Sequence, residues 1–278
     1  MLLRPQEVDY FRPLQLQHMR SIGRQIQDLQ ELGVSAIINT GRQIGETKRI
    51  VGRLGVDKFL CENGAILSNN GKISMLLPDD KKETASYLGG ELSDKLKEIN
   101  YWIPVKLTMC SVQMPAKILQ KQDEMEAFKN DLLARAMTFE KFRYFYENGK
   151  INCTLNPEAV DFSLSDWDKG KGTRAYLQKY NLDFKKSLAI GDSGSDIPMM
   201  EACGFAACPV DASDEVKNYL SGRKGSYEAK LPLTIGTMET LNAFKKMLES
   251  KEHSFPINNN LFNPHPKIMD RYEEELKI

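Results

Sequence analysis

Segments with helical periodicity alternate with short apolar runs over the first sixty residues, and this alternation limits the possible folds more than any other feature. Apolar residues recur every three or four positions over 13–32, which predicts an amphipathic helix that ends at Gly33. The apolar run 34–38 predicts a buried strand. A second helix is predicted over about 44–54 and a second strand over 58–61. This order predicts an α/β fold with helices on the faces of a parallel sheet.

The pattern changes between about residues 81 and 165. The elements predicted there are helices near 91–99 and 122–136, a strand near 105–114, and a hairpin in which 141–146 and 150–154 flank an Asn-Gly turn. We interpret this block as an inserted α+β domain. After it the alternation resumes: a helix after Gly172, a strand over 187–190, a helix over 197–203, a strand over 204–208 and a last helix from Thr237. The predicted organisation is a discontinuous core domain (1–80 and 166–250), an inserted cap (81–165) and a C-terminal tail (251–278).

Charge and cysteine content narrow the class of partner and the compartment. Lysine plus arginine and aspartate plus glutamate number 38 each, so no basic surface predicts binding to nucleic acid or to an anionic membrane. No run approaches the roughly 20 apolar residues of a membrane span. The five cysteines form no Cys-x-x-Cys pair, which favours reduced thiols. Residues 4–7 lack the apolar run of a signal peptide, so a cytoplasmic location is expected. The three histidines lie outside every motif described below.

Three short motifs stand at predicted strand ends or helix starts. Thr40-Gly41-Arg42 follows the first strand, where a hydroxyl and free N–H groups can hold a phosphate oxygen, although a simple capped turn would look the same. Lys171 lies in the glycine-rich start of a helix, where it can neutralise a phosphoryl group or simply be solvated. Asp192 and Asp196 follow another strand, and two carboxylates at this spacing suit Mg²⁺ or, alternatively, an Asx-type helix cap.

The order and spacing of these motifs resemble the haloacid dehalogenase (HAD) superfamily, in its Cof-like and sucrose-phosphatase-like branch. Two further segments add to the resemblance: Glu62-Asn63-Gly64-Ala65, and the Asp-Ala-Ser-Asp-Glu-Val-Lys run at 211–217. The resemblance spans about residues 13–249. It implies a HAD-like Rossmannoid core with a parallel sheet, interrupted by an α+β cap that selects the substrate.

The resemblance also implies residue roles. Thr40, Gly41, Arg42, Asn63 and Lys171 are expected to bind the phosphoryl group. Lys171 and Asp196 are expected to serve catalysis, and Asp192 and Asp196 to hold Mg²⁺. The implied activity is Mg²⁺-dependent hydrolysis of a small phosphorylated metabolite, such as a sugar phosphate.

The sequence departs from the family pattern in its first motif. No Asp-x-Asp-Gly-Thr run, which carries the aspartyl nucleophile, occurs in the chain. Met1-Leu2-Leu3 resembles the segment that follows this motif, so we expect the chain to start just after it. The alternative interpretation places Glu7-Val8-Asp9 in the motif's position. Without the nucleophile the covalent step has no carrier, so we expect weak or no turnover from the chain as printed. A non-catalytic phospho-ligand binding protein and a phosphomutase-like phosphotransferase are the two competing functions.

Overall fold

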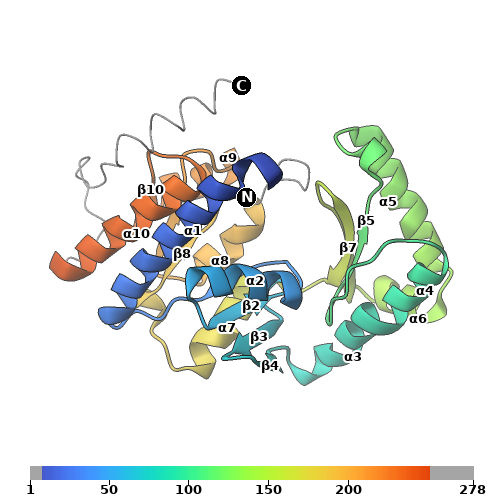
Figure 1. Cartoon of the computed structure of the whole chain (residues 1–278). Helices are drawn as coiled ribbons and strands as arrows, with labels where there is room; N and C mark the ends of the chain where they lie inside the picture. Colours follow the sequence, from blue (N-terminus) through green and yellow to red (C-terminus); the bar gives the residue numbers. More distant parts are fainter. Residues whose placement is uncertain (1–7, 251–278) are drawn as a thin grey trace. The chain divides into compact units, whose positions relative to one another are not determined.

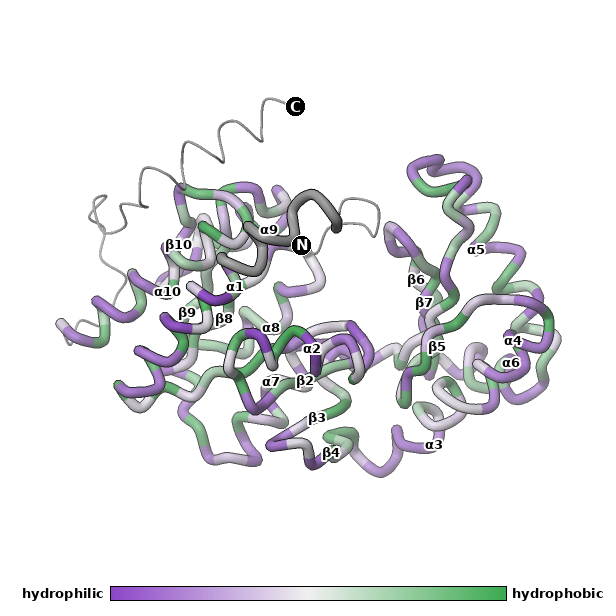
Figure 2. Tube along the Cα trace, in the orientation of Figure 1, coloured by the Kyte–Doolittle hydropathy of each residue, from purple (hydrophilic) through white to green (hydrophobic). Residues whose placement is uncertain are grey.

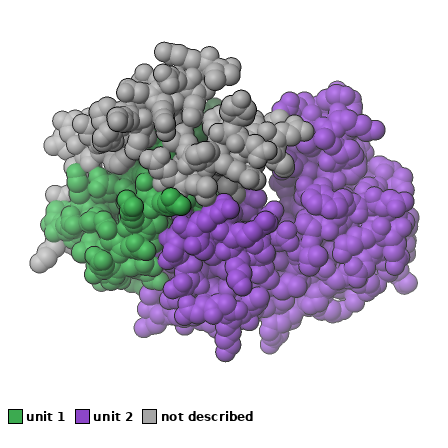
Figure 3. Space-filling model, in the orientation of Figure 1, with its two compact units in different colours: residues 1–35, 183–278 green, residues 36–182 purple. Residues whose placement is uncertain are grey.

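The computed structural model describes residues 8–250. The chain divides into two compact units (Figure 3). The first unit comprises residues 1–35 and 183–278, and the second comprises residues 36–182. The predicted domain boundaries at 80, 165 and 250 come from changes in the sequence pattern, whereas the two units are defined by their compactness in space. The predicted boundaries therefore stay a prediction. The predicted tail, 251–278, lies outside the described residues.

The first unit contains a parallel sheet of three strands in the order β10-β9-β8. Its strands are β8 (Leu188–Ile190), β9 (Phe205–Cys208) and β10 (Ser226–Glu228). Side chains alternate along a strand, so neighbouring residues face opposite sides of the sheet. Ala206 of β9 packs on one face of the sheet, whereas Phe205 packs on the other.

Helices cover both faces of this sheet. The long helices α1 (Val8–Glu31) and α10 (Leu233–Ser250) lie side by side (Figure 1) and pack with Phe205. The short helices α8 (Ile197–Glu201) and α9 (Asp214–Ser221) pack with Ala206 on the opposite face. The first unit is therefore a three-layer α/β/α arrangement, as the sequence predicts.

The second unit contains a four-stranded sheet in the order β1-β2-β3-β4. Its strands are β1 (Ile38–Asn39), β2 (Lys58–Cys61), β3 (Ile66–Asn69) and β4 (Lys72–Met75). β1 and β2 are parallel, as predicted, whereas the antiparallel strands β3 and β4 were not predicted. The helix α2 (Ile44–Leu54) contacts β2, and α7 (Lys169–Lys179) packs with Leu60 and Leu67.

A second, antiparallel sheet in this unit has the order β5-β7-β6. The elements between β4 and α7 are α3 (Asp79–Tyr87), the π-helical turn η1 (Leu88–Leu92), α4 (Ser93–Glu98), β5 (Cys110–Gln113), the 3₁₀ turn η2 (Ala116–Ile118), α5 (Gln122–Met137), α6 (Glu140–Glu147), β6 (Ile151–Leu155) and β7 (Ala159–Leu164). α5 carries both hydrophilic and hydrophobic residues along its length (Figure 2). Its buried residues Leu132 and Ala136 join a core built around Phe142 and Phe162, whose rings meet edge to face with centroids 5.0 Å apart. The predicted α+β character of this region is confirmed.

The predicted hairpin over 141–154 is wrong. Residues 141–146 lie in α6, and β6 pairs with β7 instead. Phe142 and Phe145 are both buried and lie three residues apart, so the aromatic run that alternates like a strand also fits one face of a helix. The Asn148-Gly149 pair ends α6 rather than making a hairpin turn, with Gly149 at a φ of +65°.

Several other predicted bounds differ from the structure. The first strand is shorter than predicted and covers only Ile38–Asn39. The strand predicted near 105–114 covers only Cys110–Gln113, and the last helix begins at Leu233 instead of Thr237. All five cysteines are free thiols. Among residues 8–250, no helix is long and apolar enough to cross a membrane.

Candidate functional site

The loop after β1 and the turn after β2 are joined by backbone hydrogen bonds. The N–H of Asn63 donates to the carbonyl of Thr40, and the N–H of Glu62 donates to the carbonyl of Arg42, each at 3.1 Å. The hydroxyl oxygen of Thr40 accepts a hydrogen bond from the N–H of Arg42 at 3.2 Å. The guanidinium of Arg42 forms an exposed ion pair with Glu46 at 3.5 Å. Four predicted phosphate-site residues therefore belong to one bonded assembly of two loops.

This assembly depends on an unusual backbone path. Glu62, Asn63 and Gly64 have φ values of +52°, +57° and +83°, a left-handed run in which only the glycine is unstrained. The turn directs the Asn63 amide at Gly41: a Cβ on Gly41 would lie 2.9 Å from Oδ1 of Asn63. A larger residue at position 41 would therefore displace Asn63, which explains a glycine there on packing grounds.

The N-terminus of α7 is attached to the same place. The side-chain amide of Asn39, at the end of β1, donates to the carbonyl of Lys169 and to the hydroxyl of Thr173, both at 3.0 Å. The backbones of Gly64 and Gly172 nearly touch, because a Cβ on Gly172 would lie 2.5 Å from Cα of Gly64. Through these contacts the segment that holds Lys171 lies against the two loops.

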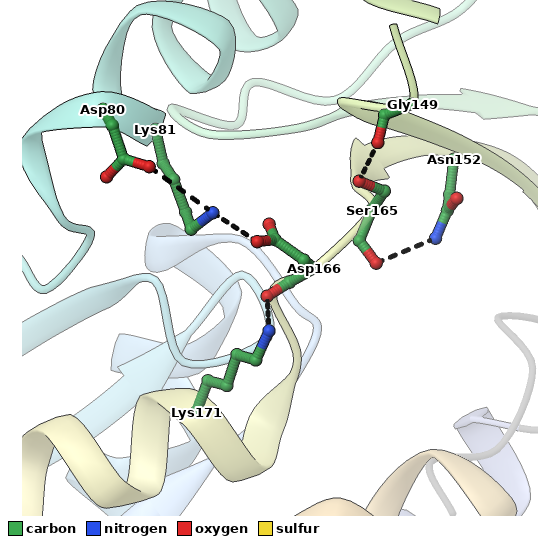
Figure 4. A network of polar contacts seen from close by, with 7 residues as sticks. All are labelled: Asp80, Lys81, Gly149, Asn152, Ser165, Asp166 and Lys171. Atoms are coloured by element: carbon green, nitrogen blue, oxygen red, sulfur yellow. Dashed lines mark hydrogen bonds and ion pairs between the residues drawn. The ribbon is translucent and has the colours of Figure 1, made fainter.

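The helix start itself is well capped. The carboxylate of Asp168 accepts a hydrogen bond from the N–H of Lys171 at 2.8 Å, as an N-cap residue does. The ammonium of Lys171 donates to the backbone carbonyl of Asp166 (Figure 4). An ammonium has three N–H donors, so this single contact leaves donor capacity for a ligand.

A short chain of charges continues from Asp166. Its carboxylate pairs with Lys81, which also lies 3.8 Å from Asp80 (Figure 4). The hydrogen bond from Lys81 holds the pKa of Asp166 below its usual range. Lys81 is the first residue of the predicted cap, and Asp166 is the first residue after it. This ion pair therefore joins the two segments that connect the predicted cap to the predicted core. Neither residue belongs to a motif that the sequence predicts as part of the site.

Asp192 and Asp196 lie in the first unit, on the loop after β8. Oδ2 of Asp196 accepts hydrogen bonds from the N–H of Asp192 at 3.2 Å, the N–H of Ser193 at 3.2 Å and the hydroxyl of Ser193 at 3.0 Å. The loop therefore has a capping box, and the buried Asp196 closes it. Gly191 is required here, because a Cβ would lie 2.4 Å from Cβ of Asp196.

The same loop contacts the start of α9. The N–H of Ser213 donates to the carbonyl of Asp192 at 2.9 Å, and the carboxylate of Glu215 lies against Gly194. Within the described residues there is no cluster of three or more histidine, cysteine, aspartate or glutamate side chains that would hold a metal by itself. The donor set still fits Mg²⁺, which commonly takes one or two carboxylates and completes its shell with water and substrate oxygens.

The predicted site residues thus fall in two groups. Thr40, Gly41, Arg42, Asn63 and Lys171 come together in the second unit, and Asp192 with Asp196 forms a separate loop in the first. The alternative first motif at Glu7-Val8-Asp9 does not have its expected context. Val8 and Asp9 lie in α1 instead of at the end of a strand, and Glu7 lies outside the described residues.

One buried acid and one buried cation of this region were also missed. The carboxylate of Glu62 accepts hydrogen bonds from the N–H of Leu107 at 3.0 and 2.9 Å, and from the N–H and hydroxyl of Thr108 at 2.7 Å each. The ammonium of Lys106 donates to the carbonyl of Gly41 at 3.2 Å. Only the tertiary structure reveals these contacts, because residues 106–108 follow Gly41 by more than sixty positions.

Comparison with known proteins agrees with this architecture. The family model of haloacid dehalogenase-like hydrolases matches residues 17–87 and 79–222, more than half of the chain. A phosphoglycolate phosphatase of Methanothrix thermoacetophila is 28% identical over 192 residues, which are 68% of this chain and 76% of that protein.

Solved structures show the same fold at low sequence identity. Protein 0175 of Thermoplasma acidophilum is similar with a TM-score of 0.56 and 15% identity, over 82% of this chain and 89% of that one. The sucrose-phosphatase of Synechocystis, solved with sucrose and phosphate, is similar with a TM-score of 0.54 and 14% identity, over 81% and 91% of the respective chains. These likenesses confirm the predicted fold class.

Proposed function

Because this chain belongs to the haloacid dehalogenase-like hydrolase family, we propose that it binds a small phosphate monoester, such as a sugar phosphate, and hydrolyses it with the help of Mg²⁺. The observation that carries the proposal is the assembly in the second unit. There, backbone hydrogen bonds and a glycine–glycine contact hold Thr40, Asn63 and the N-terminus of α7 together.

The chemistry of this assembly suits a phosphoryl group. The hydroxyl of Thr40 and the amide of Asn63 can donate to phosphoryl oxygens, and the start of α7 adds partial positive charge from its N–H groups. Lys171 supplies a full positive charge that opposes the charge of the phosphoryl group. These groups are preorganised by the fold, so little reorganisation is required when a ligand binds.

The metal proposal rests on the loop after β8. Asp192 is proposed as the Mg²⁺ ligand, and Asp196 holds the loop in shape while offering a second carboxylate. When bound, Mg²⁺ would neutralise charge on the phosphoryl oxygens during transfer. The loop's carboxylates are oxygen donors of the kind that Mg²⁺ selects over softer ligands.

A second candidate function is phosphoester binding without turnover. It stays open because residues 1–278 include no Asp-x-Asp-Gly-Thr run, the segment to which the family resemblance assigns the nucleophile. Both candidates share the binding site, and they differ only in whether inorganic phosphate is released.

The test measures binding and turnover separately. Calorimetric titration with glucose 6-phosphate, with and without Mg²⁺, should show saturable binding. Thr40→Ala and Lys171→Met should each weaken it by about 10-fold, the worth of one hydrogen bond to a charged group. Lys179→Met, at the other end of α7, is the matched control and should bind normally. Phosphate release in a colorimetric assay supports hydrolysis, and binding without release supports the second candidate.

The proposal would be overturned by one clear result. If a panel of phosphate monoesters, including the phosphoglycolate that names the Methanothrix relative, shows neither binding nor release, the assembly in the second unit is not a phosphate site.

A further inference from the structure

The segment 105–108 has the opposite polarity pattern to that of an ordinary surface segment. The side chains of Val105 and Leu107 are 69% and 43% exposed. Those of Lys106 and Thr108, which alternate with them along the chain, are only 8% and 3% exposed. Apolar side chains face solvent and polar side chains face inward. Burial of an ammonium costs free energy unless it is paired, so a buried lysine in such a segment requires an explanation.

Thr108 has a structural explanation, because its hydroxyl and N–H both donate to the carboxylate of Glu62. Lys106 does not. Its contacts are the carbonyl of Gly41 at 3.2 Å and the thioether of Met109 at 3.6 Å, a weak acceptor. Among the described residues no carboxylate lies within ion-pair distance of Lys106. The carboxylate of Glu62 accepts hydrogen bonds from the next two residues, Leu107 and Thr108, and not from the Lys106 ammonium.

The segment is held rigidly in this position. Glu62 binds its N–H groups from one side, and Gly89 lies against its carbonyls from the other, where a Cβ would stand 2.4 Å from the carbonyl carbon and oxygen of Leu107. Lys106 is therefore preorganised beside the residue that follows Thr40. The Lys106 ammonium is held in place next to the proposed phosphoryl site, and its N–H groups can still donate to a ligand. Such a cation is suited to bind an anion.

We propose that Lys106 is a specificity-determining residue that binds an anionic group on the alcohol part of the substrate. Within the proposed function, the preferred substrates are then phosphate monoesters whose leaving alcohol carries a carboxylate. This inference rests on the proposed function, since it presupposes that the phosphoryl group binds at Thr40 and Lys171. It assigns Lys106 to the leaving group because Thr40 and Lys171 are already proposed to bind the phosphoryl group.

A nearly isosteric pair of ligands tests the inference. Phosphoglycolate and ethyl phosphate share the phosphoryl group and differ mainly by a carboxylate in place of a methyl group. Calorimetric titration of the full chain should show that phosphoglycolate binds roughly 10- to 100-fold more tightly, as expected for one charge-assisted contact. Lys106→Met should reduce this preference to about 3-fold or less and leave ethyl phosphate binding within about 3-fold of the original. Lys106→Arg should restore most of the preference, because it keeps the charge.

The controls separate the possible causes. Lys117→Met removes an exposed lysine of the same region and should leave the preference unchanged, which excludes a general effect of net charge. Equal binding of both ligands to the original chain overturns the inference and leaves the proposed function intact, whereas failure of both to bind refutes the proposed function itself. If Lys106→Met weakens the binding of both ligands equally, Lys106 contacts the phosphoryl group and the inference is overturned. If the melting temperature also falls, Lys106 has a structural role, which overturns the inference as well.

Discussion

The side-chain amide of Asn39 donates a hydrogen bond to the hydroxyl of Thr173 at 3.0 Å, across 134 residues of sequence. Its second N–H goes to the carbonyl of Lys169, also at 3.0 Å. The end of the first strand and the first turn of α7 are thereby joined by one side chain. Two of the three sequence motifs come together at this contact.

Asn39→Ala should separate these two motifs. The free energy of unfolding should fall by about 1–3 kcal/mol, because two part-buried hydrogen bonds that join the strand end to α7 are lost. Phosphoester affinity should fall as well. Asn69→Ala is the matched control: Asn69 donates one hydrogen bond to Tyr180 in the same unit, away from the motifs. The control should lower stability in urea unfolding and leave calorimetric binding unchanged, and equal binding by both variants would contradict the assigned role of Asn39.

Gly172→Ala should be strongly destabilising. The new methyl group would lie 2.5 Å from Cα of Gly64, a backbone atom that cannot rotate away. A cost of about 1–3 kcal/mol or more is expected, as for other overpacked sites. Gly52→Ala in α2 is the control, since nothing lies within 4 Å of a Cβ there, and it should stabilise the protein by roughly 0.5–1 kcal/mol. Thermal unfolding of the two variants measures the difference, and similar melting temperatures would be inconsistent with this contact.

Asp192 and Asp196 should differ in what they do for the loop after β8. Asp196→Ala removes the acceptor of three hydrogen bonds and should cost about 2–4 kcal/mol of stability. Asp192→Asn should change stability by less than about 1 kcal/mol and still abolish binding of Mn²⁺, used as a paramagnetic probe for Mg²⁺. Electron paramagnetic resonance titration and urea unfolding report the two effects. Retained Mn²⁺ binding in Asp192→Asn would exclude Asp192 as the ligand.

Lys81→Met should raise the pKa of Asp166 towards its usual value, because the hydrogen bond from Lys81 is the main cause of its depression. The pKa of Asp166 is lower in the folded protein than in the unfolded chain. Its carboxylate therefore adds stability above the unfolded-state pKa, and this contribution is lost as the pH falls through the folded-state pKa. The variant should therefore lose less stability on acidification than the original chain. Lys82→Met, which removes the exposed pair with Asp79, is the control. Carboxyl NMR titration of Asp166 gives the pKa directly, and an unchanged value would contradict the pairing.

Alkaline pH should destabilise the protein through its buried thiols. Burial raises the pKa of Cys153 and of Cys208 to about 11, from an ordinary value of 9.0. The pKa of each thiol is higher in the folded protein than in the unfolded chain. Its contribution to stability is therefore complete below the unfolded-state pKa and is lost as the pH rises through the folded-state pKa. The free energy of unfolding should therefore decline between about pH 9 and 11. Urea unfolding at pH 7.5 and 10 measures this decline, and Cys153→Ala should lessen it; an identical slope in that variant would refute the contribution of Cys153.

The sequence was sufficient for the fold class and for most elements of the α/β parts, because buried parallel strands and amphipathic helices have distinct periodicities. The prediction was wrong at 141–146, where the aromatic residues fit both the strand and the helix periodicity. There the helix buries Phe142 against Phe162 in the core of this region. The β3–β4 hairpin was missed although it turns through Asn70 and Gly71, both at positive φ.

The candidate site was also predictable only where the local sequence carries a signal. Thr40, Asn63 and Lys171 stand at strand ends and a helix start, where local sequence signals are strong. Lys106 carries no such signal, since a lysine between a valine and a leucine is expected in solvent. Its burial follows from the anchoring of its neighbours by Glu62, which is a tertiary contact. The relation of Asp192 and Asp196 to Thr40 stays a prediction, because the two groups lie in different units.

The near-contact of Gly64 and Gly172 restricts how relatives of this chain can diverge. In most packed interfaces a larger residue on one side is accommodated over time by a smaller one opposite. Here both sides already lack a side chain, so no compensating replacement exists, and the collision is with main-chain atoms. Natural variants should accordingly keep both glycines together or change the path of the turn and the helix at once, and a survey of relatives can look for this paired behaviour.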